Sequence, residues 1–314
     1  MINKNIDSAI ELLRRGEVVA IPTETVYGLA ANIYNPDAIE KIFIVKQRPK
    51  NDPLIVHIHD VAQLNEVVTE IPDKAKVLME KFWPGPLTFL LKKSGKVPDD
   101  VTSGSKFVAI RMPNHPLTLQ LLSKINFPLA APSANLFQKT SPTTPQHVEQ
   151  QLGDKIPLIL DGGECWVGVE STIIGFDEED EKIINIFRLG GISVEKIKAA
   201  INCNLVIKSG SCNLPGNSKL HYSTNKPLLV GDIDELLQQH KDKKIGVLSF
   251  EKKYNAEYQV LLSEEGDLNQ AAKNLYKSMK ILDAMPVEII LAELVPDENL
   301  GKTINDRLIR ASYK

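Results

Sequence analysis

The chain has 314 residues, 43% of them hydrophobic and 25% charged, and its net charge is −3. This composition indicates a globular protein, the length favours two domains, and the charge argues against sequence-independent binding of nucleic acid. Three cysteines without a C-x-x-C spacing predict neither a disulfide framework nor a metal site, and no stretch approaches the roughly 20 apolar residues of a membrane helix. The first ten residues contain no apolar run typical of a signal peptide, so a cytoplasmic protein is expected.

The first predicted strand, residues 18–21, ends in a run of polar side chains. Pro22 ends this strand, and the next three residues are Thr23, Glu24 and Thr25. Ligands of open α/β sheets bind outside the carboxyl ends of strands, so this segment is a candidate binding site. The same residues could simply cap a turn, but similar strand ends later in the chain favour binding.

Strands and helices alternate through the first two-thirds of the chain, with short connections. Helices are predicted at residues 6–15, 35–48, 74–82 and 116–125, and strands at 54–58, 87–91, 107–110, 128–131, 158–160, 170–174 and 183–187. The polar segment 92–105 is expected to be a mobile loop that could act as a lid, and the acidic run 177–181 to be a hairpin tip. The alternation predicts an α/β fold with helices on the faces of a sheet.

Residues 209–226 are rich in Gly, Pro, Ser and Asn and lack periodicity, so they are interpreted as a linker. A smaller α/β unit follows, with strands at 228–230, 245–248, near 260 and 289–291, and helices up to 240, at 267–282 and around 304–309. The predicted organisation is a larger α/β domain at 1–208, a linker at 209–226 and a smaller C-terminal Rossmann-like α/β domain at 227–314.

Several familiar catalytic motifs do not fit the sequence. The segment 301–303 resembles the end of a phosphate-binding loop, but Pro296 stands where that loop requires its first glycine. His57 and His59 lie two apart on a predicted strand and could form a metal pair. They have no nearby cysteine or cluster of acids, so a metal site is not favoured.

A phosphate-binding pattern is formed by Lys46 and Arg48 together with Ser133 and Asn135. Two cations and two small polar side chains suit a phosphate chain, and Arg111, at another strand end, could hold a carboxylate with two hydrogen bonds. Each basic residue alone is more often a solvated surface charge. Their common position beside strand ends favours a pocket for an anionic small molecule, a nucleotide plus an acid, and leaves the reaction open.

These residues lie in motifs that resemble the threonylcarbamoyl-adenylate synthase (YrdC-like) family in its two-domain form. The motifs occur in the family's order, at residues 22–29, 46–49, 53–57, 83–88, 108–113, 131–135 and 168–173. The resemblance runs from about residue 10 to 190, and shorter similarities follow at 221–222 in the linker and 305–308 near the C-terminus.

The resemblance implies a nucleotidyltransferase that condenses L-threonine, bicarbonate and ATP into threonylcarbamoyl-adenylate and pyrophosphate. A separate transferase would use the product to modify an adenosine beside the tRNA anticodon. The resemblance also implies a twisted, largely mixed N-terminal sheet with a concave, positively charged cavity, and Mg²⁺ bound with the ATP phosphates. No protein nucleophile is needed, because the carbamate of threonine attacks the α-phosphorus, and positioning and charge neutralisation are the main catalytic effects.

By the same resemblance, the threonine-binding residues are Thr25, His57, Arg111, Ala131 and Ser171. The ATP-binding residues are Lys46, Arg48, Asp52, Ser133, Asn135, Ser141, Arg188 and Tyr222, with Lys46 and Arg48 as the catalytic pair. Three positions depart from the family's pattern: Asp52 replaces a common Asn, Phe107 stands where a polar residue is frequent, and no Pro follows Tyr222. The charge of Asp52 is expected to repel phosphate unless Mg²⁺ or Lys50 intervenes.

The alternative function is an RNA-binding module that uses the same basic cavity for tRNA or rRNA. Such a module needs basic residues spread beyond one pocket and aromatic side chains for stacking. The net charge of −3 and an aromatic content of 6% argue against it, although a weak tRNA contact would be compatible. For the enzyme, the linker is expected to close over the cavity when ATP binds, with Tyr222 near the phosphates.

Overall fold

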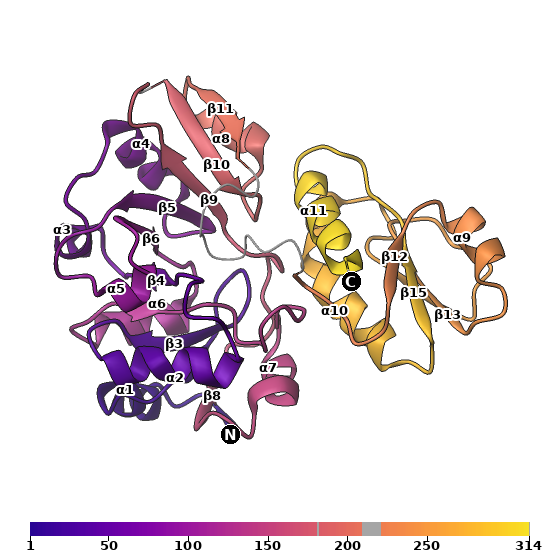
Figure 1. Ribbon diagram of the computed structural model, residues 1–314, viewed down its shortest axis with the longest axis horizontal. Coiled ribbons are helices and arrows are strands. Elements are labelled where there is room, and N and C mark those ends of the chain that lie inside the picture. Colours follow the sequence, from indigo (N-terminus) through magenta and orange to yellow (C-terminus); the bar gives the residue numbers. More distant parts are fainter. Residues whose placement is uncertain (181, 209–220, 314) are drawn as a thin grey trace.

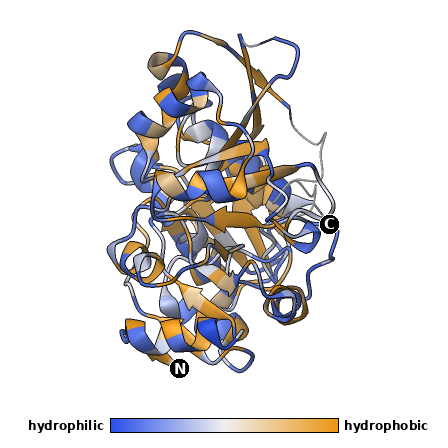
Figure 2. Ribbon diagram, turned by 90° about the vertical axis from the view of Figure 1, so that its left-hand side faces the viewer, coloured by the Kyte–Doolittle hydropathy of each residue, from blue (hydrophilic) through white to orange (hydrophobic). Residues whose placement is uncertain are grey.

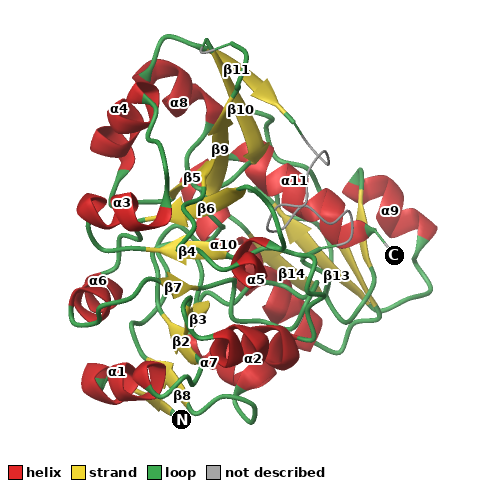
Figure 3. Cartoon of the chain, turned by 60° about the vertical axis from the view of Figure 1, so that its left-hand side comes forward, coloured by secondary structure: helices red, strands yellow, loops and turns green. Residues whose placement is uncertain are grey.

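The structure is a computed structural model that describes residues 1–180, 182–208 and 221–313. A larger N-terminal unit lies beside a smaller C-terminal unit (Figure 1). Within the described residues the N-terminal unit contains an 11-stranded sheet that begins with β1 beside β8 and ends with β11. Figure 3 shows β8 near one end of this sheet and β11 at the other. Parallel and antiparallel neighbours alternate irregularly along it, so the predicted mixed sheet is confirmed.

The strands, in spatial order, are β1 (Ile2–Asn3), β8 (Leu158–Leu160), β2 (Val19–Ile21), β3 (Gly28–Asn32), β7 (Leu129–Ala130), β4 (Ile55–His57), β6 (Phe107–Arg111), β5 (Leu87–Lys92), β9 (Thr172–Phe176), β10 (Ile183–Arg188) and β11 (Asn204–Ile207). The helices of this unit are α1 (Ile6–Arg14), α2 (Pro36–Lys46), α3 (Leu64–Val67), α4 (Asp73–Phe82), α5 (Asp99–Thr102), α6 (Pro116–Ser123), α7 (Pro145–Leu152) and α8 (Val194–Ala200), and a single 3₁₀ turn covers Val61–Gln63.

Local sequence explains how α2 begins and where it points. The Asn35 side chain accepts a hydrogen bond from the Ala38 amide, and Pro36 occupies the first helical position, as predicted. Ile39, Ile42 and Phe43 bury one face of the helix in the core. The helix then ends at Lys46, whose ammonium group contacts Ser133 and Asn135 in the segment after β7.

Helices cover only part of one sheet face, and this leaves room for a cavity. In β2, Val19 and Ile21 pack against α1 and α6, whereas Ala20, on the opposite face, joins the core beneath α2 and α4. The layer of α1 and α6 covers β8, β2, β3 and β7. Beyond β7 the same face continues with His57 of β4 and Arg111 of β6, which line a cavity instead.

The C-terminal unit is a four-stranded, all-parallel sheet in the order β12 (Leu228–Val230), β15 (Ile289–Ala292), β13 (Ile245–Ser249) and β14 (Tyr258–Leu261). The helix α9 (Ile233–Gln239) packs on one face, and α10 (Leu268–Ala284) and α11 (Gly301–Ser312) pack on the other. Figure 2, in which the N-terminal unit faces the viewer, shows the hydrophobic strands of that unit inside more hydrophilic helical turns and loops. The strand order of the C-terminal sheet differs from that of a Rossmann fold, in which the first strand neighbours the second, so only the parallel α/β character of that prediction is confirmed.

The two units share a hydrophobic core. Val26 and Val169 of the N-terminal unit cluster with Tyr222 and with apolar residues of α10 and α11. In Figure 1, α10 and α11 accordingly lie on the side of the C-terminal unit that faces the larger sheet. Part of the predicted linker is therefore core: Tyr222 is fully buried. Residues 209–220 of that linker, with the closure predicted for them, lie outside the described residues.

The prediction of a mobile loop at 92–105 is wrong. Residues Asp99–Thr102 form α5, and Val97 and Val101 are buried in the core beneath α2. The ammonium group of Lys93 donates a 3.1 Å hydrogen bond to the Val97 carbonyl oxygen. Because apolar side chains fix this segment, it does not form a lid over the cavity.

Several elements of the N-terminal unit were not predicted from the sequence: β1, β3, the 3₁₀ turn at Val61–Gln63, α3, α5, α7, α8 and β11. The hairpin at 177–181 is confirmed for the described residues 177–180, which connect antiparallel β9 and β10. No helix among the described residues is both long enough and apolar enough to cross a membrane.

Candidate active site

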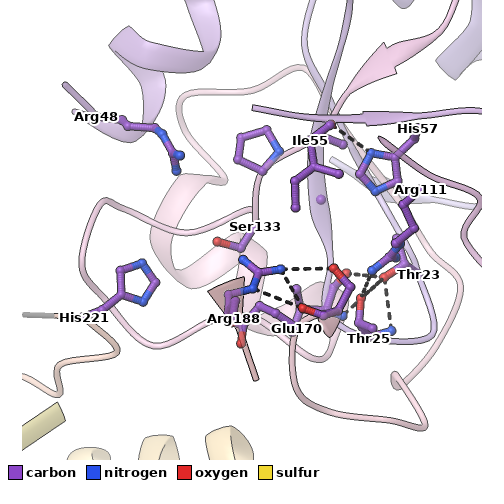
Figure 4. A pocket seen from close by; sticks show the side chains of 15 residues that line it. Thr23, Thr25, Arg48, Ile55, His57, Arg111, Ser133, Glu170, Arg188 and His221 are labelled. Atoms are coloured by element: carbon purple, nitrogen blue, oxygen red, sulfur yellow. Dashed lines mark hydrogen bonds between the residues drawn. The ribbon is translucent and has the colours of Figure 1, made fainter. Parts of the chain in front are cut away.

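A cavity on the uncovered sheet face brings together residues from several separate segments of the chain. It is lined by Thr23, Thr25, Val26, Gly28, Arg48, Ile55, His57, Arg111, Ala131, Pro132, Ser133, Glu170, Ser171, Arg188 and His221. Arg48 and His221 lie on one side of it, and His57 and Arg111 lie on the other (Figure 4). Of the predicted site residues, the cavity lining includes Thr25, Arg48, His57, Arg111, Ala131, Ser133, Ser171 and Arg188, and it does not include Lys46, Asp52, Asn135, Ser141 or Tyr222.

Arg111 is the cation at the end of β6. Its Nη1 donates to the Thr25 hydroxyl at 2.9 Å, and its Nη2 forms a 3.3 Å ion pair with Glu24. The Nε of Arg111 has no hydrogen-bond partner among the described residues, although the side chain is almost fully buried. A buried guanidinium with an unused donor is suited to an incoming carboxylate.

His57 lies next to Arg111 and is uncharged at neutral pH. Burial, together with the nearby charge of Arg111, lowers the pKa of His57 to about 3. Its Nδ1 lies 3.1 Å from the Ile55 carbonyl oxygen, which fixes the ring. His57 therefore contributes a neutral polar wall and no positive charge.

Ser171 and Arg188 are locked together on the floor of the cavity. The guanidinium of Arg188 donates to the Ser171 carbonyl oxygen at 2.9 and 3.1 Å and to the Ser171 hydroxyl at 3.0 Å. The same hydroxyl lies 2.7 Å from that of Thr88. These contacts hold one positive charge at the base of the cavity.

Lys46 supports the cavity wall from behind. Its ammonium group donates to the carbonyl oxygens of Ser133 and Asn135, at 2.5 and 2.6 Å. Burial and the neighbouring charge of Arg48 lower the pKa of Lys46 well below its usual value. Lys46 thus fixes the turn that carries Ser133, whose side chain faces the cavity (Figure 4).

Arg48 reaches the cavity itself and is anchored within its own loop. It forms a 2.8 Å ion pair with Asp52 and donates a 2.9 Å hydrogen bond to the Pro53 carbonyl oxygen. The partner of Asp52 is therefore Arg48, whereas Lys50 pairs with Glu40. The amide of Asn135 donates to two backbone carbonyls, and its Oδ1 has no hydrogen-bond partner among the described residues.

Glu170 and His221 line the cavity but were not predicted as site residues, whereas Thr23, which also lines it, belongs to the strand-end segment predicted as a binding site. Glu170 accepts a 2.6 Å hydrogen bond from Ser141, so the predicted ATP ligand Ser141 is committed to this carboxylate. Thr23 and Glu170 lie within the quoted motifs 22–29 and 168–173, and this position was the available signal. The third residue, His221, adjoins Tyr222, whose hydroxyl has no hydrogen-bond partner among the described residues.

Comparisons with known proteins cover nearly the whole chain. Residues 11–190 match a family described as telomere recombination, and residues 192–312 match the family described as threonylcarbamoyl-AMP synthase, C-terminal domain. The chain is 42% identical to the threonylcarbamoyl-AMP synthase of Bacillus subtilis (strain 168), over 98% of this chain and 92% of the relative. It is 38% identical to that of Pyrococcus abyssi (strain GE5 / Orsay), over 97% and 93%.

A solved structure has the same arrangement over both units. The crystal structure of P. abyssi Sua5 complexed with L-threonine matches with a TM-score of 0.91 and 38% identity, and the match covers 98% of this chain and 94% of that one.

Proposed function

The chain belongs to the Sua5 two-domain family of threonylcarbamoyl-AMP synthases, which are nucleotidyltransferases, and we propose that the cavity of Figure 4 is where its substrates react. The observation that carries this proposal is the convergence of Arg48, Arg111 and Arg188 on one cavity. Threonine carbamate and ATP are both anions, and three fixed cations reduce the repulsion between them.

Threonine is assigned to the side of the cavity formed by Arg111, with Thr25, His57, Ala131 and Ser171 around it. The unused Nε donor of Arg111 suits the threonine carboxylate. Neutral His57 limits the positive charge here to one guanidinium, which matches one carboxylate. The structural relative was crystallised with L-threonine, which supports a threonine site in this cavity.

ATP is assigned to the opposite side, where Arg48 and Ser133 line the wall and Lys46 supports it from behind. Arg188 lies at the base between the two halves. Asp52, Asn135, Ser141 and Tyr222 lie outside the cavity lining, so their predicted part in ATP binding is proposed to act through the residues they hold: Asp52 pairs with Arg48, and Ser141 bonds to Glu170. An oxygen of the threonine carbamate then attacks the α-phosphorus, and the bond to the bridging oxygen breaks to release pyrophosphate.

Magnesium is proposed to enter with ATP. Three carboxylates lie in or beside the cavity, and each is already paired with an arginine: Glu24 with Arg111, Asp52 with Arg48, and Glu170 with Arg307. Among the described residues, no group of three potential metal-ligating side chains was found. Mg²⁺ would therefore be held by the phosphates and water, as is common for nucleotide-bound magnesium, and would neutralise phosphate charge.

We further propose that the product passes to a separate tRNA threonylcarbamoyl transferase, that any contact of this chain with tRNA is weak, and that the enzyme acts in the cytoplasm. The test of the function is exchange of labelled pyrophosphate into ATP. Exchange is expected only when both L-threonine and bicarbonate are present. Exchange that proceeds without threonine would overturn the assignment of the cavity.

A further inference from the structure

Glu170 lies between the cavity and the C-terminal unit. Its carboxylate belongs to the cavity lining, and among the described residues it accepts hydrogen bonds from Ser141 and from two side chains of the C-terminal helices. The hydroxyl of Tyr276, on α10, lies 2.9 and 3.1 Å from the two carboxylate oxygens. The Nε of Arg307, on α11, donates to Glu170 at 3.0 Å.

This contact is a buried ion pair. Arg307 and Tyr276 are fully buried, and Glu170 is 6% exposed. Burial alone would raise the pKa of Glu170, but the charges of Arg307 and Arg188 and the hydrogen bond from Ser141 lower this pKa to about 2. The carboxylate is therefore ionised at neutral pH, and loss of one partner would leave a buried charge without compensation.

The same helix, α11, also holds the second chain segment that forms the cavity floor. The Nη2 of Arg307 donates to the Leu189 carbonyl oxygen at 2.6 Å. The Thr303 hydroxyl donates to the Gly190 carbonyl oxygen at 3.0 Å. Leu189 directly follows Arg188, just as Ser171 directly follows Glu170. One arginine of the C-terminal unit thus contacts the chain immediately beside both floor residues.

Arg307 and Tyr276 also hold the described end of the linker. The Arg307 guanidinium lies 4.8 Å from the centre of the Tyr222 ring, and Tyr222 and Tyr276 stack with ring centres 5.5 Å apart. His221, which lines the cavity, packs edge-on against Tyr222. Arg307 and Tyr276 therefore support two parts of the cavity: the floor, through Glu170 and Leu189, and the His221 side, through Tyr222.

We propose that Arg307 and Tyr276 are positioning residues for the synthase reaction, and that through Glu170 they fix Ser171 and Arg188 in the arrangement that binds threonine and ATP. This inference rests on the proposed roles of Ser171 and Arg188. It gives the C-terminal unit a function, because side chains of α10 and α11 hold Glu170 and the chain beside Arg188 from behind the cavity. Neither Arg307 nor Tyr276 is expected to touch the reacting atoms.

Full-length variants test this proposal, with Lys302→Ala as the matched control. Lys302 also lies on α11 and also bridges the two units, through an ion pair with Glu195 of α8, but both side chains of this pair are partly exposed and lie outside the cavity. Steady-state constants for threonine and for ATP are measured with the thermal midpoint of each variant, at a temperature where all variants are folded.

Arg307→Gln is expected to lower kcat/KM for threonine by about 100-fold, since displacement of positioned groups by an ångström has effects of this size. Tyr276→Phe removes only a hydroxyl, keeps the ring stacked on Tyr222, and is expected to cost about tenfold. Arg307→Lys retains the charge but not the guanidinium geometry. Compared with Arg307→Gln, it should restore the thermal midpoint more than kcat/KM for threonine. Lys302→Ala should change the constants by less than about twofold.

If folded Arg307→Gln and Tyr276→Phe have the constants of the control, the proposal is wrong. If Arg307→Gln does not fold, Tyr276→Phe alone decides the result. Absence of threonine-dependent exchange in the wild-type protein would instead contradict the proposed use of the cavity. In that case, calorimetric threonine binding by Tyr276→Phe and Lys302→Ala decides whether these residues position Ser171.

Discussion

Arg48 and Asp52 form a 2.8 Å ion pair just beyond the C-terminal end of α2, so the cation that faces the cavity carries its own counter-ion. Their side chains are 5% and 16% exposed, respectively, which means that water screens the pair only weakly. A phosphate bound beside Arg48 would therefore be attracted by the guanidinium and repelled by the Asp52 carboxylate.

Asp52→Asn should strengthen ATP binding. The substitution keeps an oxygen that can accept the Arg48 hydrogen bond but removes one negative charge near the phosphates. A gain of roughly 1 kcal/mol, about fivefold in Kd, is expected from charge removal at this range. Calorimetric titration with Mg–ATP provides the measurement. Glu40→Gln is the control, because it removes a charge on α2 whose partner is the exposed Lys50; equal gains in both variants would indicate a net-charge effect.

Lys46→Met should weaken ATP binding by about tenfold or more, although Lys46 does not line the cavity. The variant preserves length and apolar volume but leaves the carbonyl oxygens of Ser133 and Asn135 without their donor. Unsatisfied buried groups cost about 1–3 kcal/mol each, so the turn that carries Ser133 should shift. Lys41→Met, on the same helix but bonded to Gly16 and Glu17 outside the cavity, is the comparison. An unchanged Kd for ATP would exclude Lys46 from nucleotide binding.

The free energy of unfolding should decrease as the pH falls from about 6.5 towards 3, and His57 should cause part of this decrease. Burial and Arg111 lower the pKa of folded His57 to about 3, whereas the unfolded side chain titrates near 6.5. Between these values the unfolded state binds the additional proton, so stability increases with pH, at most by about 1.4 kcal/mol per unit. Urea denaturation at several pH values should give a shallower dependence for His57→Gln; an identical slope would contradict the neutral assignment.

The sequence predicted those parts of the fold that depend on local signals. The cap at Asn35 placed the start of α2 correctly, and the polar residues after short apolar strands indicated the cavity side of the sheet. The start of α7 has a similar local signal: Thr144 caps the helix and Pro145 occupies its first position. In the segment 92–105, polar composition obscured two apolar residues four positions apart, Val97 and Val101, which bury one face of a short turn.

The remaining features depend on contacts that no local pattern contains. Glu170 and Arg307 are 137 positions apart in the sequence, and their pairing requires both units to be folded. The four residues of β11 are mostly exposed and resemble a loop until β10 is available as a parallel neighbour. The polar composition of the linker likewise did not predict a residue buried in the core. Tyr222 nevertheless packs against Tyr276 and Arg307.

Arg111→Ala should abolish most threonine binding while leaving ATP binding nearly intact. Arg111 lies on the side of the cavity opposite Arg48 (Figure 4), so loss of its guanidinium should not reach the nucleotide half. Removal of one partner of a buried charge pair costs about 2–5 kcal/mol, which includes the penalty of leaving Glu24 unpaired.

Glu24→Gln separates the loss of the Arg111–threonine contact from the penalty of an unpaired Glu24, because the substitution removes the Glu24 charge. Alone, it should retain threonine binding through Arg111. Combined with Arg111→Ala, it should restore part of the stability, measured by thermal denaturation, but none of the threonine affinity, measured by calorimetry. Recovery of threonine binding in the double variant would show that Arg111 balances Glu24 and does not bind the threonine carboxylate. Equal loss of ATP and threonine binding in Arg111→Ala would place both ligands on the same cation.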